Sequence, residues 1–189
     1  METNEKYEVA LLLADGFEEV EATSVIVFVR HSGISLVTVS VTGNHRVVGA
    51  HGVPFTADAL LNEVDFSSIQ MLVMPGGIPG ADNLSKSKDV NRIVKQFYDQ
   101  GKWIAAICAA PLVLGKLGLL KGKRITCYPG FESYMEGAEI IGENSVVDGN
   151  LMTANGTDSG MYFVYNIVAQ LRDENTAREM ANGMMVNYF

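Results

Sequence analysis

Residues 103–111 read Trp103-Ile104-Ala105-Ala106-Ile107-Cys108-Ala109-Ala110-Pro111, and the class of fold can be worked out from this stretch. Its first five residues are an uninterrupted apolar run of the length of a buried strand. Small residues surround Cys108 and permit a sharp turn, and proline is favoured in the first turn of a helix. The stretch therefore predicts a buried strand, an elbow at Cys108 and a helix that begins near Pro111.

Strand-like runs and helix-like segments alternate on both sides of this stretch. The strand-like runs are residues 9–13, 35–41, 70–74, 103–107 and 124–127, and the other helix-like segments are residues 18 to about 33, 89–100, 159–171 and 174–182. Two further runs, residues 145–147 and 151–153, predict a short hairpin. The alternation predicts a mostly parallel sheet with helices on both faces. No linker or internal repeat divides the chain, so residues 1–189 are expected to form one domain.

The first of these helix-like segments is apolar on nearly every side. Its run Val25-Ile26-Val27-Phe28-Val29 resembles a strand, but the acidic start at Glu18 and the Arg30-His31-Ser32-Gly33 end favour a helix. A helix outside a sheet needs one apolar stripe, so a surplus face with Ile26 and Val29 should meet another surface. A second copy of the chain, in a two-fold homodimer, is the favoured partner. The alternative is that a loop of the same chain covers this face.

Composition argues against several classes of function. The chain carries 14 Lys and Arg against 22 Asp and Glu, a net charge of −8, whereas nucleic-acid binding needs clustered Lys and Arg. The same charge disfavours anionic membranes, and the sequence has neither a membrane-length apolar run nor a signal-peptide pattern. Two cysteines, Cys108 and Cys127, give no disulfide framework and no zinc spacing. We therefore expect a cytoplasmic protein that binds neither nucleic acid nor membranes.

Three loops should meet beyond the carboxyl ends of the strands, where ligands bind in this class of fold. They are residues 15–21, 75–80 and 105–111. In the third loop the Cys108 thiol would lie at a helix N-terminus, whose field lowers the pKa of a thiol. Cys108 is therefore a candidate nucleophile, and the alternative is a small buried cysteine that only fills space.

A carboxyl group is the candidate partner of this thiol. All three histidines precede Cys108, so a hydrolase order with a downstream histidine is not available. Glu21 falls on the helical stripe of Phe17, Val25 and Phe28 and should face inward, where a carboxyl tends to stay protonated. A protonated Glu21 can hydrogen-bond a thiolate and exchange protons with a substrate. The alternative is that Glu21 caps the helix or faces solvent.

The segment Pro75-Gly76-Gly77 follows a strand and leaves backbone amides bare at the sheet edge. Such amides can bind an anion or a developing oxyanion. Pro-Gly-Gly is equally typical of a plain turn, so both interpretations stay open at this point.

Together the three loops resemble the ThiJ/PfpI superfamily, in particular its protein deglycase and glyoxalase III-like branch. The motifs are Ala14-Asp15-Gly16-Phe17-Glu18-Glu19-Val20-Glu21, Met74-Pro75-Gly76-Gly77 with Gly80-Ala81-Asp82-Asn83-Leu84, and Ala105-Ala106-Ile107-Cys108-Ala109-Ala110-Pro111. They occur in the order and at the separations of that family, and the resemblance extends from Val9 to about Leu171.

The resemblance implies a flavodoxin-like three-layer sandwich, akin to class I glutamine amidotransferases, and a homodimer. It implies that Cys108 is the nucleophile and Glu21 its protonated partner. It also implies an oxyanion and substrate pocket, made of Gly76, Gly77, Ala109, Tyr128 and Glu18. The activities of this branch are conversion of methylglyoxal to lactate without metal or cofactor, repair of glycated substrates, and oxidative-stress sensing or chaperone action.

The chain departs from the family pattern at several places. Relatives often have a histidine where this chain has Tyr128, and a tyrosine is a poor base at neutral pH. Ala109 replaces the histidine of the protease-like branch, which argues against a peptidase. His51 stands where close relatives have an arginine. Gly156-Thr157-Asp158-Ser159 replaces a Gly-Pro-Gly-Thr-like turn, so we expect the pocket rim to differ.

Two functions stay open. In the first, Cys108 adds to small reactive carbonyls such as methylglyoxal, and Glu21 moves protons through an enediol. In the second, the chain is an oxidative-stress sensor or chaperone-like protein whose Cys108 is a redox-sensitive thiol. An amidotransferase-like activity is a weaker third alternative, because no histidine follows Cys108. The fold alone does not separate these functions.

Overall fold

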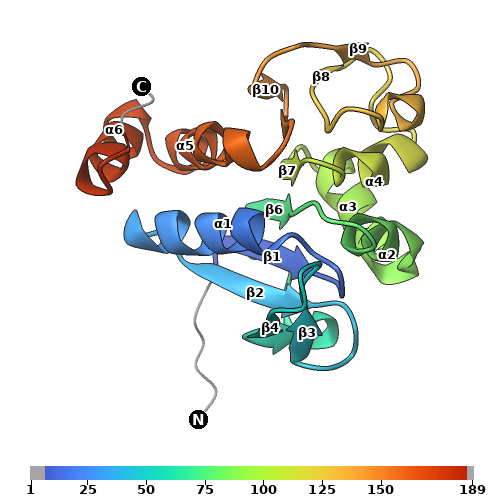
Figure 1. Ribbon diagram of the computed structural model, residues 1–189, viewed down its shortest axis with the longest axis horizontal. Helices are drawn as coiled ribbons and strands as arrows, with labels where there is room; N and C mark the ends of the chain where they lie inside the picture. Colours follow the sequence, from blue (N-terminus) through green and yellow to red (C-terminus); the bar gives the residue numbers. More distant parts are fainter. Residues whose placement is uncertain (1–6, 187–189) are drawn as a thin grey trace.

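A seven-stranded sheet forms the centre of the molecule. The computed structural model describes residues 7–186, and Figure 1 shows how they surround this sheet. Its strands, in spatial order, are β10 (Ser145–Asp148), β11 (Leu151–Ala154), β7 (Trp103–Ile107), β6 (Met71–Met74), β1 (Val9–Leu13), β2 (Leu36–Ser40) and β5 (Ala59–Leu60). Every neighbouring pair is parallel except the predicted β10–β11 hairpin. The prediction of a mostly parallel sheet is therefore confirmed.

Helices cover both faces of the sheet. One face carries α1 (Glu19–His31), α5 (Gly160–Leu171) and α6 (Glu174–Gly183), and the other carries α2 (Gly80–Lys86), α3 (Lys88–Asp99) and α4 (Pro111–Lys116). Successive residues of a buried strand point to opposite faces: in β1, Leu11 and Leu13 pack with the first layer, whereas Ala10 and Leu12 pack with the second. The result is the three-layer sandwich that was predicted. None of the helices in residues 7–186 is long and apolar enough to cross a membrane.

Two small sheets and three 3-10 helices complete the described chain. β3 (Arg46–Val48) pairs with β4 (Pro54–Thr56), and β8 (Arg124–Ile125) pairs with β9 (Glu139–Ile140). The 3-10 helices are η1 (Leu61–Glu63), η2 (Glu132–Tyr134) and η3 (Thr157–Ser159).

The strand predicted over residues 124–127 is wrong in extent, because only its first two residues pair and they pair outside the central sheet. Two later backbone amides in this stretch of chain have other partners. The Thr126 amide donates to the Thr153 side chain, and the Tyr128 amide donates to the Cys108 carbonyl. After Ile125 the chain is therefore no longer a strand, and its backbone bonds to the elbow after β7.

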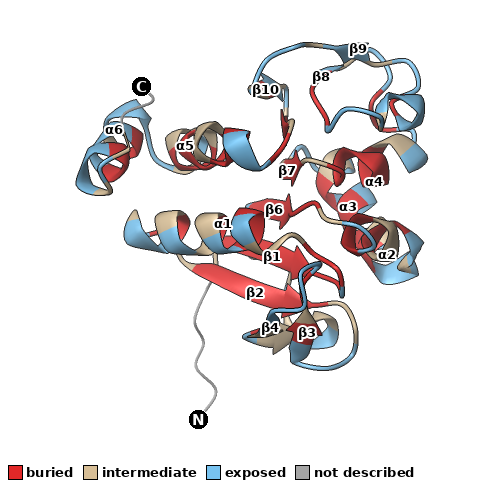
Figure 2. Ribbon diagram, in the orientation of Figure 1, coloured by how far each residue is buried: buried red, intermediate tan, exposed pale blue. Residues whose placement is uncertain are grey.

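The exposed apolar face of α1 differs from the predicted one. Val29 is fully buried and Ile26 is half-buried, whereas Val20 and Val27 are 53% and 49% exposed. The reason is that Val25 and Val29, one turn apart, pack into the core of the chain itself. Figure 2 shows the alternation of buried and exposed positions along α1. The helix predicted there is confirmed, but its surplus face consists of Val20 and Val27.

Candidate active site

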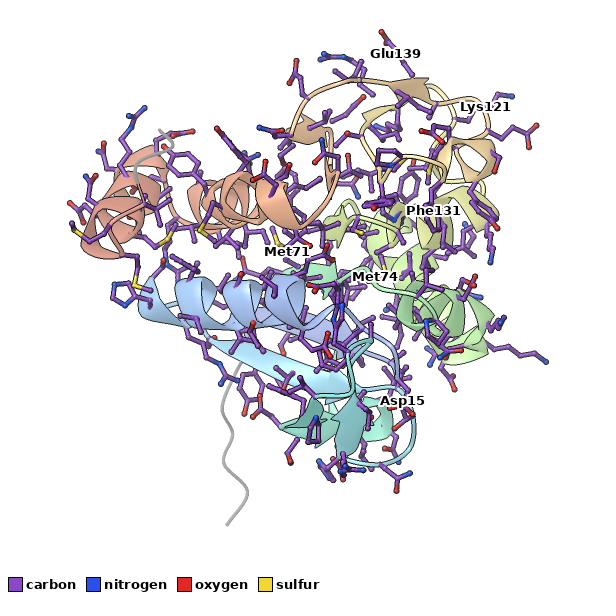
Figure 3. The ribbon with its side chains drawn as sticks, in the orientation of Figure 1. Asp15, Met71, Met74, Lys121, Phe131 and Glu139 are labelled. Carbon is purple, nitrogen blue, oxygen red and sulfur yellow. The ribbon has the colours of Figure 1, made fainter. Side chains whose placement is uncertain are left out.

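The loops after β1, β6 and β7 meet at one edge of the sheet. The three strands are neighbours, and their ends are aligned because Leu11 pairs with Val73 and Met74 pairs with Ala106. Met74, the last residue of β6, lies near the centre of the view in Figure 3. Side chains from these loops therefore converge at the carboxyl edge, where open α/β sheets bind ligands.

Cys108 forms a sharp elbow between β7 and α4. Its φ is 63°, a left-handed conformation that residues other than glycine rarely adopt. Its amide donates to the Ala154 carbonyl at 2.8 Å, and its carbonyl accepts from the Tyr128 amide at 2.9 Å. A strained residue held between a strand and a helix is the geometry of a nucleophile elbow. The strand, elbow and helix predicted over residues 103–111 are all present.

Glu21, in the first turn of α1, places a buried carboxyl group beside the thiol. The residue is only 2% exposed. Its Oε2 accepts from the Gly76 amide at 2.8 Å, and its Oε1 accepts from the Thr157 hydroxyl at 3.1 Å. A further hydrogen bond joins the carboxyl group to the Cys108 thiol. Glu21 therefore faces inward, as expected, and neither caps the helix nor faces solvent.

Gly76 and Gly77 let the three loops approach closely. A Cβ atom on Gly76 would lie 2.5 Å from the Cβ of Cys108 and 2.8 Å from Oε2 of Glu21, closer than such atoms come in proteins. Gly77 has a φ of +87°, which favours glycine. The backbone amides of Gly77 and Ala109 hydrogen-bond to the Cys108 sulfur. Two amide donors at one reacting atom can stabilise a thiolate or an oxyanion.

Burial sets the protonation of the two acids. The pKa of Glu21 is raised from 4.5 to about 7, chiefly by burial; the Gly76 hydrogen bond opposes the rise and the Glu18 charge adds to it. The pKa of Cys108 is raised to about 12, chiefly by burial and then by the negative charge of an ionised Glu21. The lowered thiol pKa expected from the helix N-terminus is therefore wrong in direction. Burial and the neighbouring carboxylate outweigh the amides that favour the thiolate.

The Glu21–Cys108 pair consequently shares one proton over a wide pH range. Each negative charge opposes the other, so between about pH 7 and about pH 12 the pair carries one proton. Because the two groups are hydrogen-bonded, a proton can pass directly between them. An ionised Glu21 can therefore accept the thiol proton as the sulfur reacts, and Cys108 has no need to rest as a thiolate.

Glu18 caps α1 and lies next to Glu21. Its Oε2 accepts from the Glu21 amide at 2.7 Å and so satisfies a free donor of the helix N-terminus. Its own amide donates to the Gly76 carbonyl at 2.9 Å, which ties the start of α1 to the loop after β6. The capping role that the sequence left open for Glu21 thus belongs to Glu18.

Tyr128 lies at the rim of the site. The residue is 49% exposed, although its backbone amide contacts Cys108. Its ring lies beside Gly156, where an added Cβ would be 3.6 Å from a ring carbon, and it meets Phe131 edge-on with 6.3 Å between ring centroids. A phenol in this position can donate a hydrogen bond to a bound molecule.

Comparison with known proteins places the chain in a family. A family model described as "DJ-1/PfpI family" matches residues 7–170. The chain belongs to the DJ-1/PfpI family. Protein dj-1beta of Drosophila melanogaster is 31% identical over 94% of this chain and 96% of that protein. DJ-1 homolog B of Arabidopsis thaliana is 33% identical over 94% of this chain, which spans only 41% of that longer relative.

Solved DJ-1 structures share the fold. Oxidised DJ-1 of Toxoplasma gondii has a TM-score of 0.92 and 31% identity, and the match covers 96% of this chain and 100% of that one. A DJ-1 superfamily protein of Salmonella typhimurium has a TM-score of 0.92 and 32% identity at the same coverage. The family inferred from the three loops, and its flavodoxin-like fold, are thereby confirmed. A putative cysteine protease of Bacillus subtilis is also similar, at 32% identity over 79% of this chain and 89% of the relative.

Thr157 is a residue of this DJ-1/PfpI site that sequence reasoning placed only in a variable turn at the pocket rim. It begins η3, just beyond the carboxyl end of β11, and its hydroxyl contacts Glu21. Because β11 is the neighbour of β7 in the sheet, the loop after β11 reaches the same edge as Cys108. Its position after a strand of the central sheet is the signal that could have identified it.

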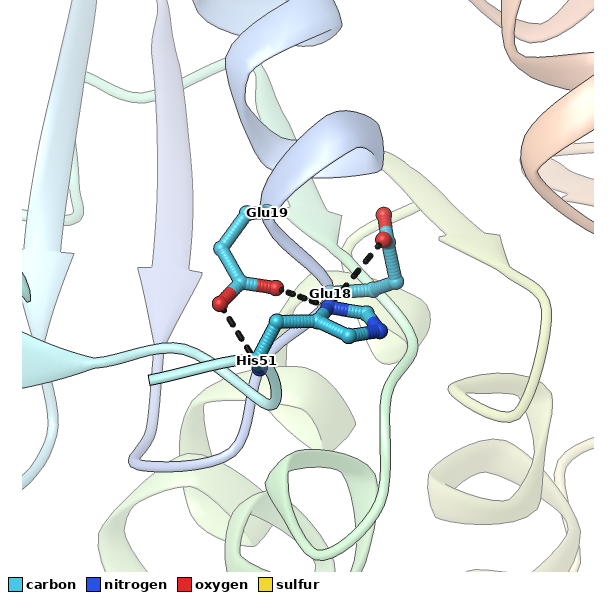
Figure 4. A group of neighbouring side chains, drawn as sticks. All are labelled: Glu18, Glu19 and His51. Atoms are coloured by element: carbon cyan, nitrogen blue, oxygen red, sulfur yellow. Dashed lines mark hydrogen bonds and ion pairs between the residues drawn. The ribbon is translucent and has the colours of Figure 1, made fainter. Parts of the chain in front are cut away.

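Glu18 also belongs to a second group of side chains, with Glu19 and His51 (Figure 4). Nδ1 of His51 lies 2.7 Å from Oε2 of Glu19 and 3.9 Å from Oε1 of Glu18. The hydrogen bond to Glu19 raises the pKa of His51. The pKa of Glu19 is lowered. Burial alone would raise this pKa, but hydrogen bonds, chiefly those from His51, outweigh burial. The three ligand atoms lie within 4.8 Å of one another, and the His51 imidazole lies between the two carboxylates.

Proposed function

We propose that the protein is a cysteine-dependent, cofactor-independent enzyme that acts on small reactive carbonyls and converts methylglyoxal to lactate. The observation that supports this most directly is the hydrogen bond between the Cys108 thiol and a buried Glu21 carboxyl group whose pKa is about 7. A proton-transfer group works best when its pKa lies near the working pH, because it can then both accept and donate. The strained elbow and the two amide donors at the sulfur fit the same chemistry.

The first step is addition of sulfur to the aldehyde. Ionised Glu21 accepts the thiol proton while the Cys108 sulfur bonds to the aldehyde carbon and the carbonyl π bond opens. The oxygen that gains the electron pair then takes the proton back from Glu21, which leaves a hemithioacetal. The amides of Gly77 and Ala109, which hydrogen-bond to the sulfur, can stabilise the charge that develops next to it.

The second step moves hydrogen within the substrate. Glu21, ionised again, removes the hydrogen of the former aldehyde carbon as a proton, and the electron pair forms a double bond to the neighbouring carbonyl carbon. That carbonyl oxygen takes the proton from Glu21, which gives an enediol. Glu21 then accepts the hydroxyl proton of the carbon bonded to sulfur and delivers a proton to the neighbouring carbon, which gives a lactoyl thioester on Cys108. Water cleaves the thioester, releases lactate and restores the thiol. The net change adds one water to methylglyoxal, so no external oxidant or reductant is needed.

Glycated substrates fall within the same proposal. Early adducts of methylglyoxal with amines or thiols are in equilibrium with the free dicarbonyl and keep the same two carbons. Cys108 can attack those carbons in the adduct or after its release, with the same proton transfers by Glu21. Lactate is the expected product by either route.

Turnover of methylglyoxal tests the proposal. Wild-type protein freed of metal by chelation should form lactate, and Cys108→Ala should form none. Glu21→Gln should lose turnover by about 10²-fold or more, the scale of lost acid–base catalysis. Its thiol should nevertheless alkylate with a midpoint at lower pH, because the carboxylate charge that raises the pKa of Cys108 is gone. Glu139→Gln, the same change at an exposed residue of β9, is the control.

The outcomes separate the parts of the proposal. Lactate formation by Cys108→Ala at the wild-type rate would exclude the cysteine mechanism. Unchanged turnover in Glu21→Gln would remove Glu21 from the mechanism and leave Cys108 in it. No lactate from the wild type would exclude the glyoxalase activity as a whole.

Redox sensing through Cys108 is the second candidate function. The sulfur accepts hydrogen bonds from two backbone amides, which would stabilise an oxidised, negatively charged sulfur, and a similar solved structure is of an oxidised DJ-1. Peroxide would transfer one oxygen to the thiolate, which gives a sulfenate and water. Peptide masses after graded peroxide should show oxygen on Cys108 before Cys127, which is only 6% exposed. Oxidation of both cysteines at equal rates would contradict this role.

A further inference from the structure

The charged groups that act on the reacting thiol are acidic. Glu21 is hydrogen-bonded to Cys108, and its charge raises the pKa of that thiol. Glu18 lies next to Glu21, and its charge in turn raises the pKa of Glu21. Two carboxyl groups within one turn at the start of α1 therefore set the charge next to the sulfur.

Glu18 is held in place at this position. Its Oε2 is fixed by the Glu21 amide at 2.7 Å, and its backbone is fixed to the Gly76 carbonyl at 2.9 Å. The side chain is 14% exposed, so its charge is only partly screened by water. The carboxylate is therefore fixed next to Glu21 by its hydrogen bond and by the backbone that carries it.

The basic side chain beside Glu18 bonds chiefly to another carboxylate, that of Glu19. His51 donates its backbone amide to Oε1 of Glu19 at 2.8 Å and places Nδ1 2.7 Å from Oε2 of the same carboxylate. Figure 4 marks two hydrogen bonds between His51 and Glu19 and one ion pair between the imidazole and Glu18. The distance from Nδ1 to Oε1 of Glu18 is 3.9 Å, longer than a hydrogen bond. One imidazole thus faces two carboxylates, so even a protonated His51 leaves this group with a net negative charge.

We propose that the Cys108 site selects its reaction partners by charge, with Glu18 as the residue that sets the preference. The site accepts neutral and cationic electrophiles and disfavours those that carry a carboxylate, sulfonate or phosphate near the reacting carbon. This inference rests on the proposed function. For that function it predicts that the enzyme acts on neutral α-oxoaldehydes and on adducts carried by cationic side chains. The anionic α-oxo acids and phosphorylated sugars fall outside this substrate class.

The size of the effect follows from Coulomb's law. Two unit charges a few ångströms apart at the edge of a protein interact strongly enough to change a rate by about fivefold or more, depending on the effective dielectric constant. Opposite signs on two otherwise similar reagents should therefore produce a rate ratio on the order of tenfold or more. Salt screens partly exposed charges, so the ratio should fall as ionic strength rises.

A matched pair of thiol reagents measures this preference without any turnover assay. Trimethylammonium-ethyl and sulfonato-ethyl methanethiosulfonate carry opposite charges on the same reactive group. With each, the Cys108 sulfur attacks the sulfenyl sulfur, a mixed disulfide forms and methanesulfinate leaves. Both reagents react with the same thiolate, so the ratio of their rates cancels any effect of a substitution on thiol ionisation. Peptide masses separate labelling of Cys108 from labelling of Cys127.

The expected result is a cation-to-anion rate ratio at Cys108 about tenfold or more above that of a small neutral thiol such as β-mercaptoethanol. Glu18→Gln should reduce the ratio by about threefold or more, since one negative charge beside the site is removed. Glu139→Gln makes the same change on β9, at the outer edge of the molecule in Figure 3, and should leave the ratio unchanged.

Two results would overturn the inference. One is a ratio equal to that of the small thiol, which would mean that the site has no charge preference. The other is a ratio that Glu18→Gln leaves unchanged, which would assign the preference to other groups. A Cys108 that reacts with neither reagent would contradict the proposed function itself, so the two failures are distinguishable.

Discussion

The Thr157 hydroxyl tunes the carboxyl group on which the proposed chemistry depends. It donates to Oε1 of Glu21 at 3.1 Å, and this hydrogen bond lowers the pKa of Glu21 against the larger effect of burial. Thr157→Val removes the donor with little change of shape, so the pKa of Glu21 should rise further. The acid limb of methylglyoxal turnover should then move to higher pH by up to about one unit, the scale of one lost hydrogen bond. Thr157→Ser keeps the donor and should restore the wild-type profile, whereas an unmoved limb in Thr157→Val would show that the hydroxyl does not act on Glu21.

Glu21 should also make stability depend on pH. Its pKa is raised from 4.5 to about 7 in the folded protein, so its contribution stabilises the fold fully below about pH 4.5 and is lost as pH rises through about 7. A rise of this size corresponds to about 3 kcal/mol, at about 1.4 kcal/mol for each pKa unit. Between about pH 4 and about pH 8, wild type should lose about 3 kcal/mol more unfolding free energy than Glu21→Gln, whose amide does not titrate. Urea unfolding of both proteins across this range measures the difference, and parallel curves would mean that Glu21 is not buried as described.

At the scale of elements, the site depends on how closely the loop after β6 approaches the elbow after β7. A Cβ on Gly76 would lie 2.5 Å from the Cβ of Cys108 and 2.9 Å from its sulfur. Gly76→Ala should therefore push the two loops apart, lower turnover by about 10²-fold and destabilise the fold by about 1–3 kcal/mol. Gly142→Ala is the matched control, since an added Cβ there meets nothing within 4 Å. Lactate assays and urea unfolding should separate the two variants, and equal behaviour would show that the contact is not needed.

The elements that the sequence predicts well are those whose pattern is local. The strand of residues 103–107 and the elbow at Cys108 follow from an apolar run, small neighbours and a proline, and they are present as predicted. The β3–β4 hairpin and α2 were not predicted, because their short segments carry no apolar period long enough to read. β8 has a strand-like sequence, but its neighbours in space decide where it pairs.

The candidate site likewise has features that the sequence predicts and features that it does not. The convergence of Cys108, Glu21 and Gly76 follows from topology, because loops after adjacent parallel strands share one edge. The direction of the thiol pKa was predicted wrongly, because it depends on how deeply three loops bury the sulfur and on the charge of Glu21. Thr157 reaches the site from more than a hundred residues away, and its place after the strand-like run of residues 151–153 is the signal in the sequence that points to this edge of the sheet.

At the scale of the whole molecule, an apolar patch remains exposed beside the site. Val20 and Val27 are two turns apart on α1 and share one face of the helix. Val53, 53% exposed, is held near the start of α1, because its amide and that of His51 donate to Oε1 of Glu19. Exposed patches of this kind mark interfaces, and a two-fold dimer is the commonest closed arrangement. The homodimer therefore stays a prediction, with its seam moved from Ile26 and Val29 to Val20, Val27 and Val53.

Light scattering at micromolar concentration tests this assembly. The wild type should give about twice the 20.5 kDa of one chain. The double variant Val20→Glu and Val27→Glu should give the mass of one chain, because two buried charges per subunit would lack partners in the seam. Ile140→Glu alters an equally apolar residue, 43% exposed on β9, and should stay dimeric. A wild-type mass of one chain would refute the dimer, and a double variant that stays dimeric would refute this placement of the seam. Because Glu18 and Glu21 lie in the same turns of α1 as Val20, monomers should also lose turnover, which ties assembly to the site.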